Sequence, residues 1–223
     1  MENPFEAGQV ILIDKPLHWT SADVVKKIRN LVHVKVGHAG TLDPLATGLL
    51  ILCTGKFTKK ISEYMSQEKE YTGTFTLGGS TASYDLETEP GNFKDFSGIT
   101  DARIQEIARQ FTGEIMQVPP AYSAIKKNGH RAYDLARQGK TFSLEKRKIT
   151  IHTFEMQSAA LPVINFRVVC STGTYIRSLA YDVGEALGCG AYLSKLCRTR
   201  IGSYSLRDAL TMDAAAGKFK MGN

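Results

Sequence analysis

Several patterns that assign proteins to familiar classes are missing from this sequence of 223 residues. No stretch approaches the ~20 consecutive apolar residues that a transmembrane helix needs. The five histidines show no metal-ligand spacing and no HExxH motif occurs. The phosphate-binding signatures GxGxxG and GxxxxGK(S/T) and the hydrolase signature GxSxG are absent as well. We therefore expect a protein without a membrane span, a bound metal or a nucleotide cofactor.

Cysteine is also scarce, and the four cysteines form no CxxC pair (Cys53, Cys170, Cys189 and Cys197). Most of them stand in apolar or strand-like segments, which favours reduced thiols in or near the core over a disulfide framework. The N-terminal residues include acids and no long apolar run, so the sequence shows no signal peptide. These features predict a cytoplasmic protein.

Charge is unevenly distributed along the chain, which has a formal net charge of +6. Residues 85–106 hold six acids and two bases, and residues 126–148 hold eight bases and two acids. Residues 195–207 hold four bases and no acid. A solvated surface explains any one such run, whereas two basic runs in separate segments favour a groove that binds a polyanion.

Hydrophobic patterning predicts a mixture of strands and helices without the regular strand–helix–strand rhythm of a parallel sheet. Strands are expected at residues 9–14, 49–53, 71–77, 163–171 and 195–206, and helices at residues 21–32, 57–65, 101–111 and 174–187. The sequence shows no internal repeat and no linker. We therefore predict an α+β fold in a single domain that covers residues 1–223.

The sequence is organised around residues 38–50, which read HAGTLDPLATGLL. Asp43 is the single acid of this stretch, Gly40 and Gly48 flank it, and Pro44 follows it directly. Glycine permits unusual backbone angles and proline fixes φ. The pattern predicts a tight loop before a buried strand, with one carboxylate held out of the loop. An ordinary Asp-Pro turn before a core strand is the alternative.

A single carboxylate does not match the paired acids that most glycoside hydrolases use. It can still act on a glycosidic carbon, either as a nucleophile or by stabilising positive charge on the sugar. To stay ionised in a partly dry pocket, Asp43 needs a cation nearby. Arg177, which follows GTYI at the expected start of a helix, is the first candidate and Lys15 is the second.

Five stretches, in the same order, resemble the motifs of one family, the B-type branch of the bacterial tRNA pseudouridine-55 synthases. They are residues 37–48 (the catalytic motif), Asp14-Lys15-Pro16 with Thr20-Ser21 (the N-terminal motif), Lys69-Glu70-Tyr71 (a strand), residues 117–137 (an RNA-gripping insertion) and residues 170–177 (CSTGTYIR, a further catalytic motif). The similarity extends from about residue 9 to residue 206. His18 departs from it, because the family often has glycine at this position.

The resemblance implies that uridine 55 in the T-loop of tRNA is isomerised to pseudouridine without a cofactor. It also implies a pseudouridine synthase catalytic fold, with a mixed, largely antiparallel sheet and a central RNA-binding cleft. The RNA-gripping insertion is expected at about residues 117–148. Too few residues follow Leu206 for the separate C-terminal RNA-binding domain that many members carry, so none is expected. The expected partner is the T-arm stem-loop of tRNA, and we expect a monomer.

The resemblance also assigns roles to individual residues. Asp43 matches the catalytic aspartate, Arg177 matches its ion-pair partner, and Tyr71 matches the tyrosine that stacks on the target base. Tyr175 and Leu196 match positions that line the pocket. Considered without the family, a structural role in the core is favoured for Tyr71, and a core residue alone is the alternative for Leu196.

The remaining predicted contacts are with the RNA. His38 matches the histidine that fills the space left by the flipped nucleotide, although a plain loop hydrogen-bond donor is the alternative. Lys15, Lys126, Lys127 and Arg131 complete the predicted substrate-binding set. No metal-binding residue is predicted.

Two other classes of function stay open at this point. The chain could be an RNA-binding protein or tRNA-folding factor whose chemistry is secondary, or a glycosidase of small molecules. The presence of Asp43, Tyr71 and Arg177 favours catalysis over binding alone, because a binding module does not need an isolated loop carboxylate. The basic runs argue against a small-molecule substrate, which would leave them without a use.

Overall fold

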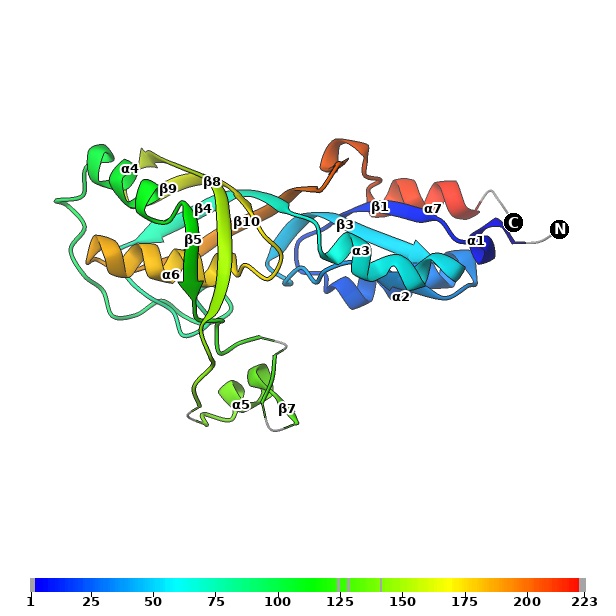
Figure 1. Cartoon of the computed structure of the whole chain (residues 1–223), viewed down its shortest axis with the longest axis horizontal. Coiled ribbons are helices and arrows are strands. Elements are labelled where there is room, and N and C mark those ends of the chain that lie inside the picture. Colours follow the sequence, from blue (N-terminus) through cyan, green and yellow to red (C-terminus); the bar gives the residue numbers. More distant parts are fainter. Residues whose placement is uncertain (1–2, 124, 128, 141, 221–223) are drawn as a thin grey trace. The chain divides into compact units, whose positions relative to one another are not determined.

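The computed structural model describes residues 3–123, 125–127, 129–140 and 142–220 (Figure 1). The chain forms two compact units. Unit 1 consists of Met1–Thr72 and Lys195–Asn223, and unit 2 consists of Gly73–Ser194. Two strands, β4 (Lys69–Leu77) and β10 (Ala191–Ile201), run from one unit into the other. Unit 1 is therefore built from two segments that are far apart in the sequence.

Unit 1 combines a sheet with short helices. Its strands follow the order β1-β3-β10-β4, with β2 added to β3 and β11 added to β10. The pairing of β1 and β2 with β3 is antiparallel, whereas β10 pairs with β3 in parallel. Besides parts of β4 and β10, the unit contains α1 (Pro4–Ala7), β1 (Val10–Lys15), α2 (Ser21–Val32), β2 (Val36–His38), β3 (Ala46–Thr54), the 3₁₀ helix η1 (Gly55–Lys60), α3 (Ile61–Met65), β11 (Tyr204–Ser205), the 3₁₀ helix η2 (Leu206–Asp208) and α7 (Met212–Lys220).

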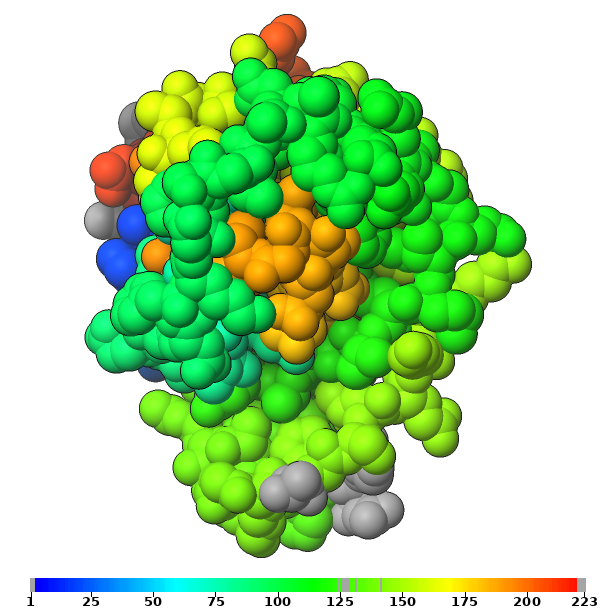
Figure 2. All heavy atoms as spheres, turned by 90° about the vertical axis from the view of Figure 1, so that its left-hand side faces the viewer, coloured from blue at the N-terminus to red at the C-terminus, as the bar shows by residue number. Residues whose placement is uncertain are grey.

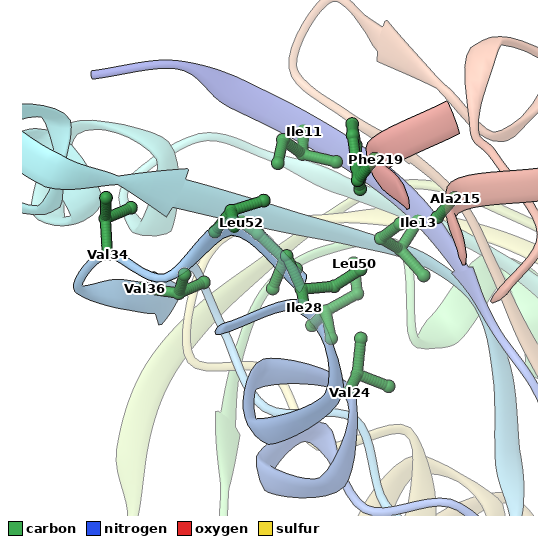
Figure 3. Close-up of a cluster of buried hydrophobic side chains, with 11 residues drawn as sticks. Ile11, Ile13, Val24, Ile28, Val34, Val36, Leu50, Leu52, Ala215 and Phe219 are labelled. Carbon is green, nitrogen blue, oxygen red and sulfur yellow. The ribbon is translucent and has the colours of Figure 1, made fainter. Parts of the chain in front are cut away.

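Strand β3 is the centre of unit 1 because both of its faces are buried. Successive side chains of a strand point to opposite faces. Leu50 and Leu52 pack with residues of β1, α2, β2 and α7, as Figure 3 shows. Leu49 and Ile51 belong to a second cluster, which includes Ile201 of β10. The continuous apolar run after the Asp43 loop thus anchors that loop to two separate clusters of core residues.

Helix α2 is defined by a cap at its start and an apolar face. Thr20 Oγ1 accepts a hydrogen bond from Asp23 N (3.0 Å), and Asp23 Oδ2 accepts one from Thr20 N (2.9 Å), which completes a capping box. Val24, Ile28 and Val32 are buried one turn apart. Each such side chain contributes about 1.5–3 kcal/mol on burial. The helix expected at residues 21–32 is therefore confirmed.

Unit 2 is built around a sheet with the strand order β10-β4-β9-β8-β5, in which β8 pairs antiparallel with β9 and with β5. Helix α4 lies against β8 and against α6. In Figure 2, α6 (orange) is framed by the segment before α4 and by α4 itself (blue-green and green). The elements are α4 (Asp101–Gln110), β5 (Gly113–Gln117), β6 (Lys126–Lys127), β7 (His130–Arg131), α5 (Ala132–Arg137), β8 (Arg147–Ala160), β9 (Val163–Cys170) and α6 (Ile176–Leu187).

The predicted α+β class and the largely antiparallel sheet are confirmed. Two predicted boundaries were wrong. The helix expected at residues 57–65 is a 3₁₀ helix followed by the short helix α3. The strand expected at residues 195–206 ends at Ile201, because Gly202 adopts a φ of 53° and the chain turns back so that Tyr204 pairs with Ile201.

Candidate active site

The Asp43 loop joins β2 to β3 in unit 1, and it is fixed to the start of α2. Ser21 Oγ accepts a hydrogen bond from Leu42 N (2.9 Å) and donates one to Leu42 O (3.1 Å). On the other side of the loop, Ala46 N donates to Asp43 O (3.0 Å). The backbone on both sides of the carboxylate is therefore held in place.

Arg198 of β10 holds the ends of the same loop. Its side chain is 1 % exposed, Nε donates to Leu49 O (2.8 Å), and Nη2 donates to Gly40 O (3.0 Å). The sequence places Arg198 in a basic run that we expected to hold RNA phosphates. That expectation was wrong for this residue, because its guanidinium lies inside the unit. Nearby Arg200 forms an ion pair with Glu68 (2.8 Å).

Lys15, at the end of β1, is a buried cation near Asp43. Its Nζ donates to Trp19 O (2.6 Å) and to Pro16 O (3.0 Å), and the side chain has no exposed surface. Burial lowers the pKa of Lys15 to about 8, against the opposing effect of the negative charge of Asp43. The second candidate cation of the sequence analysis therefore lies within electrostatic reach of the carboxylate.

Three further predicted site residues belong to unit 1. His38 ends β2, and its pKa is lowered first by burial and then by the positive charge of Arg198, which favours the neutral imidazole. Leu196 of β10 pairs with Ala46, the first residue of β3, and is partly buried. Tyr71 of β4 is 9 % exposed. The parallel pairing of β10 with β3 thus brings Leu196 to the end of the Asp43 loop.

Arg177 belongs to unit 2, as the second residue of α6, and is 5 % exposed. Its Nε lies 3.7 Å from Asp85 Oδ2, and its Nη1 donates to Ser83 O (3.3 Å). Sequence reasoning missed Asp85 as a partner, since the only signal was its place in an acid-rich segment. The pairing of Arg177 with Asp43 stays a prediction.

Tyr175, directly before α6, has a rigidly held backbone. The Gln117 side chain accepts a hydrogen bond from Tyr175 N (2.8 Å) and donates one to Tyr175 O (3.0 Å). Arg147 places its guanidinium 4.5 Å from the centre of the tyrosine ring and also donates to Gly173 O. This cation–π contact orients the ring at the start of the helix that carries the site arginine.

The three basic residues predicted in the insertion lie on a small ribbon in unit 2. Lys126 pairs with Arg131 and Lys127 pairs with His130, in the antiparallel β6–β7 pair. Helix α5 follows directly. The register therefore places basic residues opposite one another.

Within the described ranges, no group of three histidine, cysteine or acidic side chains is arranged to hold a metal ion. The helices of the described residues include none that is long and apolar enough to cross a membrane. All four cysteines are free thiols, and three of them are buried.

Solved structures with this fold include the chain titled "Crystal Structure of a Cbf5-Nop10-Gar1 Complex", with a TM-score of 0.74 and 29% identity, which matches 98% of this chain and 57% of its own. The "Crystal structure of the archaeal box H/ACA sRNP Nop10-Cbf5 complex" matches with a TM-score of 0.71 and 26% identity, over 96% of this chain and 54% of its own. The present chain thus spans just over half the length of these structures.

Curated relatives match at higher identity. "tRNA pseudouridine synthase B" of Flavobacterium johnsoniae is 56% identical over 211 residues, 91% of this chain and 92% of the relative. The proteins of the same name from Phocaeicola vulgatus and Chlorobaculum tepidum are each 48% identical, over 94% of this chain and 92% and 90% of their own lengths.

Family models agree with these matches. The model of "TruB family pseudouridylate synthase (N terminal domain)" matches residues 26–176, and that of "tRNA pseudouridylate synthase B C-terminal domain" matches residues 177–220. The chain therefore belongs to the TruB family of pseudouridylate synthases. Residues 177–220 contribute to both units of the structure and do not form a unit of their own. The absence of a separate C-terminal RNA-binding domain stays a prediction.

Proposed function

We propose that this protein isomerises uridine 55 in the T-loop of tRNA to pseudouridine, with Asp43 as the catalytic nucleophile. The observation that carries the proposal is the Asp43 loop, whose ends are held by Arg198 and which has the buried cation Lys15 within electrostatic reach. Relatives named tRNA pseudouridine synthase B, at 48–56% identity over most of both chains, support tRNA as the substrate.

The reaction consumes no second substrate and no oxidant or reductant, because substrate and product are isomers. The N-glycosidic bond breaks, the uracil turns within the pocket, and a carbon–carbon bond forms from C5 of the base to the same sugar carbon. C5 loses its proton, and the nitrogen that was bonded to the sugar gains one. The base must first leave the folded T-loop, which costs a few kcal/mol. Asp43 acts on the sugar, and Tyr71 stacks on the extruded base to offset that cost.

The other predicted site residues fit the same scheme. Arg177 pairs with Asp43 and keeps the carboxylate ionised. Tyr175 and Leu196 form walls that exclude water, since water that reached the sugar during the reaction would release free uracil. His38 fills the space that the flipped nucleotide leaves.

RNA binding rests on the insertion at residues 117–148, in which Lys126, Lys127 and Arg131 contact phosphates. The two units work as one catalytic domain, residues 1–223, and the enzyme acts as a monomer in the cytoplasm. An isolated T-arm stem-loop should be nearly as good a substrate as whole tRNA, because the insertion grips the stem-loop itself.

The proposal is tested by mapping pseudouridine in a T-arm stem-loop incubated with the purified protein. Asp43→Asn should abolish turnover while RNA affinity stays within a few fold, because asparagine keeps the size of the side chain and removes its charge. Asp208→Asn removes an exposed carboxylate from the same unit and should leave the rate unchanged. Substantial turnover by Asp43→Asn would remove Asp43 as the nucleophile.

The same variant distinguishes the proposed function from the alternative, which is a tRNA-folding factor whose chemistry is secondary. If Asp43→Asn refolds misfolded tRNA as well as the wild type does, then folding activity exists beside catalysis. If wild-type protein forms no pseudouridine in either RNA, the proposed reaction is wrong.

A further inference from the structure

The outer face of α2 gathers positive charge that the proposed reaction does not use. Lys26, Lys27 and Arg29 are exposed on this helix, and Lys35 is exposed just beyond its end. Among the residues that the structure describes, no carboxylate lies within 4.0 Å of their charged nitrogens. We call these four residues the α2 basic surface.

Two adjoining hollows lie along this surface. The first has a volume of about 370 Å³ and is lined by His18, Trp19, Asp23, Lys26, Lys27 and Asn30. The second has a volume of about 430 Å³ and is lined by Arg29, Asn30, His33, Val34 and Lys35. Asn30 lines both, so the hollows follow one another along the helix.

The acid in the first hollow does not cancel the charge of the surface. The Asp23 carboxylate accepts hydrogen bonds from the hydroxyl and the backbone N–H of Thr20, and these bonds lower its pKa. The carboxylate therefore stays ionised and offsets only one of the four positive charges. The surface keeps an excess of cations for an external anion.

The α2 basic surface adjoins the Asp43 loop within unit 1. Ser21, the first residue of α2, bonds to both backbone groups of Leu42. His18 lines the first hollow, and its backbone N–H donates to Pro44 O (2.8 Å), on the other side of Asp43. A polymer that reaches Asp43 therefore finds the first hollow next to the loop.

We propose that the α2 basic surface binds the sugar-phosphate backbone of the RNA strand that flanks the reacting nucleotide. The proposal deepens, and rests on, the RNA substrate of the proposed function. Helix α2 has 12 residues and is ~18 Å long, which accommodates several phosphates of one strand. Trp19 packs in part against the core and also lines the first hollow, where its accessible part can contact an unpaired base. Aromatic rings among cations are typical of surfaces that bind single-stranded RNA. This combination favours RNA over an acidic protein.

The test compares two double variants that remove equal charge from unit 1. Lys26→Ala/Lys27→Ala alters the α2 basic surface, and Lys56→Ala/Lys59→Ala removes two exposed lysines from η1. The dissociation constant of a T-arm stem-loop is measured over a salt series, together with the single-turnover rate at saturating RNA. Melting curves check that both variants fold as the wild type does.

We expect the α2 variant to bind about tenfold more weakly and to lose about two from the slope of log K against log salt, one for each phosphate contact. Its saturating rate should match that of the wild type, and the η1 variant should match in every measurement. An unchanged slope and affinity in the α2 variant would overturn the inference, as would an equal loss in both variants. If the wild type binds through α2 but forms no pseudouridine, the proposed function fails and the RNA surface stands.

Discussion

Lys15 is an unusual residue in this chain, because a lysine without exposed surface is held by two carbonyl oxygens and the charge of Asp43. Its burial has a consequence for stability. The folded pKa of about 8 lies below the value of 10.5 for an unperturbed lysine. Between these values the unfolded chain binds more protons than the folded one, so stability rises with pH across this window.

We therefore predict that wild-type protein gains stability relative to Lys15→Met as pH rises from 8 to 10, by about 1–3 kcal/mol. The other titrating groups are the same in both proteins, so their effect on stability cancels in the difference. Methionine keeps the length of the lysine side chain but cannot ionise. Urea unfolding of both proteins at pH 8, 9 and 10 measures the difference. Parallel stability curves for the two proteins would show that the lysine keeps an ordinary pKa in the fold.

Arg177 carries a second prediction at this scale. Arg177→Ala should reduce the rate strongly and move the acidic limb of the pH–rate profile to higher pH, because the pKa of Asp43 rises when its cation is removed. Asp85→Asn serves as the comparison, since it removes the carboxylate partner that the structure gives to Arg177. If the acidic limb of Arg177→Ala lies at the same pH as that of the wild type, Arg177 is the ion-pair partner of Asp85 and not of Asp43.

His18 explains a departure from the family resemblance. Its φ of 67° lies in the left-handed region, where glycine is most easily accommodated. Histidine is among the few other residues enriched there. The backbone conformation therefore accounts for the glycine often found at this position, and a histidine is compatible with it.

At the scale of elements, Gly48 is the residue that allows β3 to pass close to β10. Its φ is 103°, and a Cβ at this position would lie 2.4 Å from the backbone oxygen of Arg198. Gly48→Ala should therefore lower the free energy of unfolding by about 2–4 kcal/mol. The control is Gly217→Ala in α7, where an added Cβ meets nothing within 4 Å. That change should leave stability unchanged or raise it by up to about 1 kcal/mol, and equal effects in urea unfolding would contradict the argument.

The β6–β7 ribbon gives the second prediction for an element. Replacing Lys126, Lys127 and Arg131 by alanine should weaken stem-loop binding and flatten its salt dependence, with a smaller change in single-turnover rate at saturating RNA. Lys94→Ala, an exposed lysine elsewhere in unit 2, is the control. Normal binding with an unchanged salt slope would identify the ribbon as an ordinary surface loop.

Hydrophobic patterns predicted those helices and strands in which the pattern runs without interruption along the element. The period of α2 and the apolar run of β3 are complete within a dozen residues, so both were recognised. Strand β8 was not predicted, because its register shifts between Ile151 and Thr153. Ile149 and Ile151 are buried before the shift and Phe154 and Met156 after it, so the alternation changes phase within the strand.

At the scale of the whole molecule, the proposed reaction predicts independence from added cofactors. Turnover of a pre-folded minimal stem-loop should survive excess EDTA and need no added nucleotide. A loss of turnover in EDTA that one divalent ion restores, beyond what RNA folding requires, would contradict this. The stem-loop is preferred to tRNA because whole tRNA needs magnesium to fold.

Family motifs predicted individual residues of the candidate site. They did not predict the contacts that depend on packing between distant parts of the sequence. The roles of Asp43 and Lys15 in the site stay predictions, but the strands next to them and the helix that carries Arg177 were predicted from the sequence. The burial of Arg198 was not, because its partners at Gly40 and Leu49 are 158 and 149 residues earlier in the chain. Asp85 was missed for the same reason, since Arg177 follows it after the whole of β5, β8 and β9.

The distance between Arg198 and its partners also bears on how a newly made chain becomes active. A ribosome completes the Asp43 loop early in synthesis, but the arginine that holds both ends of the loop emerges only after all of unit 2 has been made. A nascent chain that stops before β10 can therefore form the contacts of the loop with Ser21 and Ala46, but it lacks those with Arg198. Only a chain translated through Arg198 can complete the set of contacts around this loop, so a part of the molecule that is synthesised early is finished late.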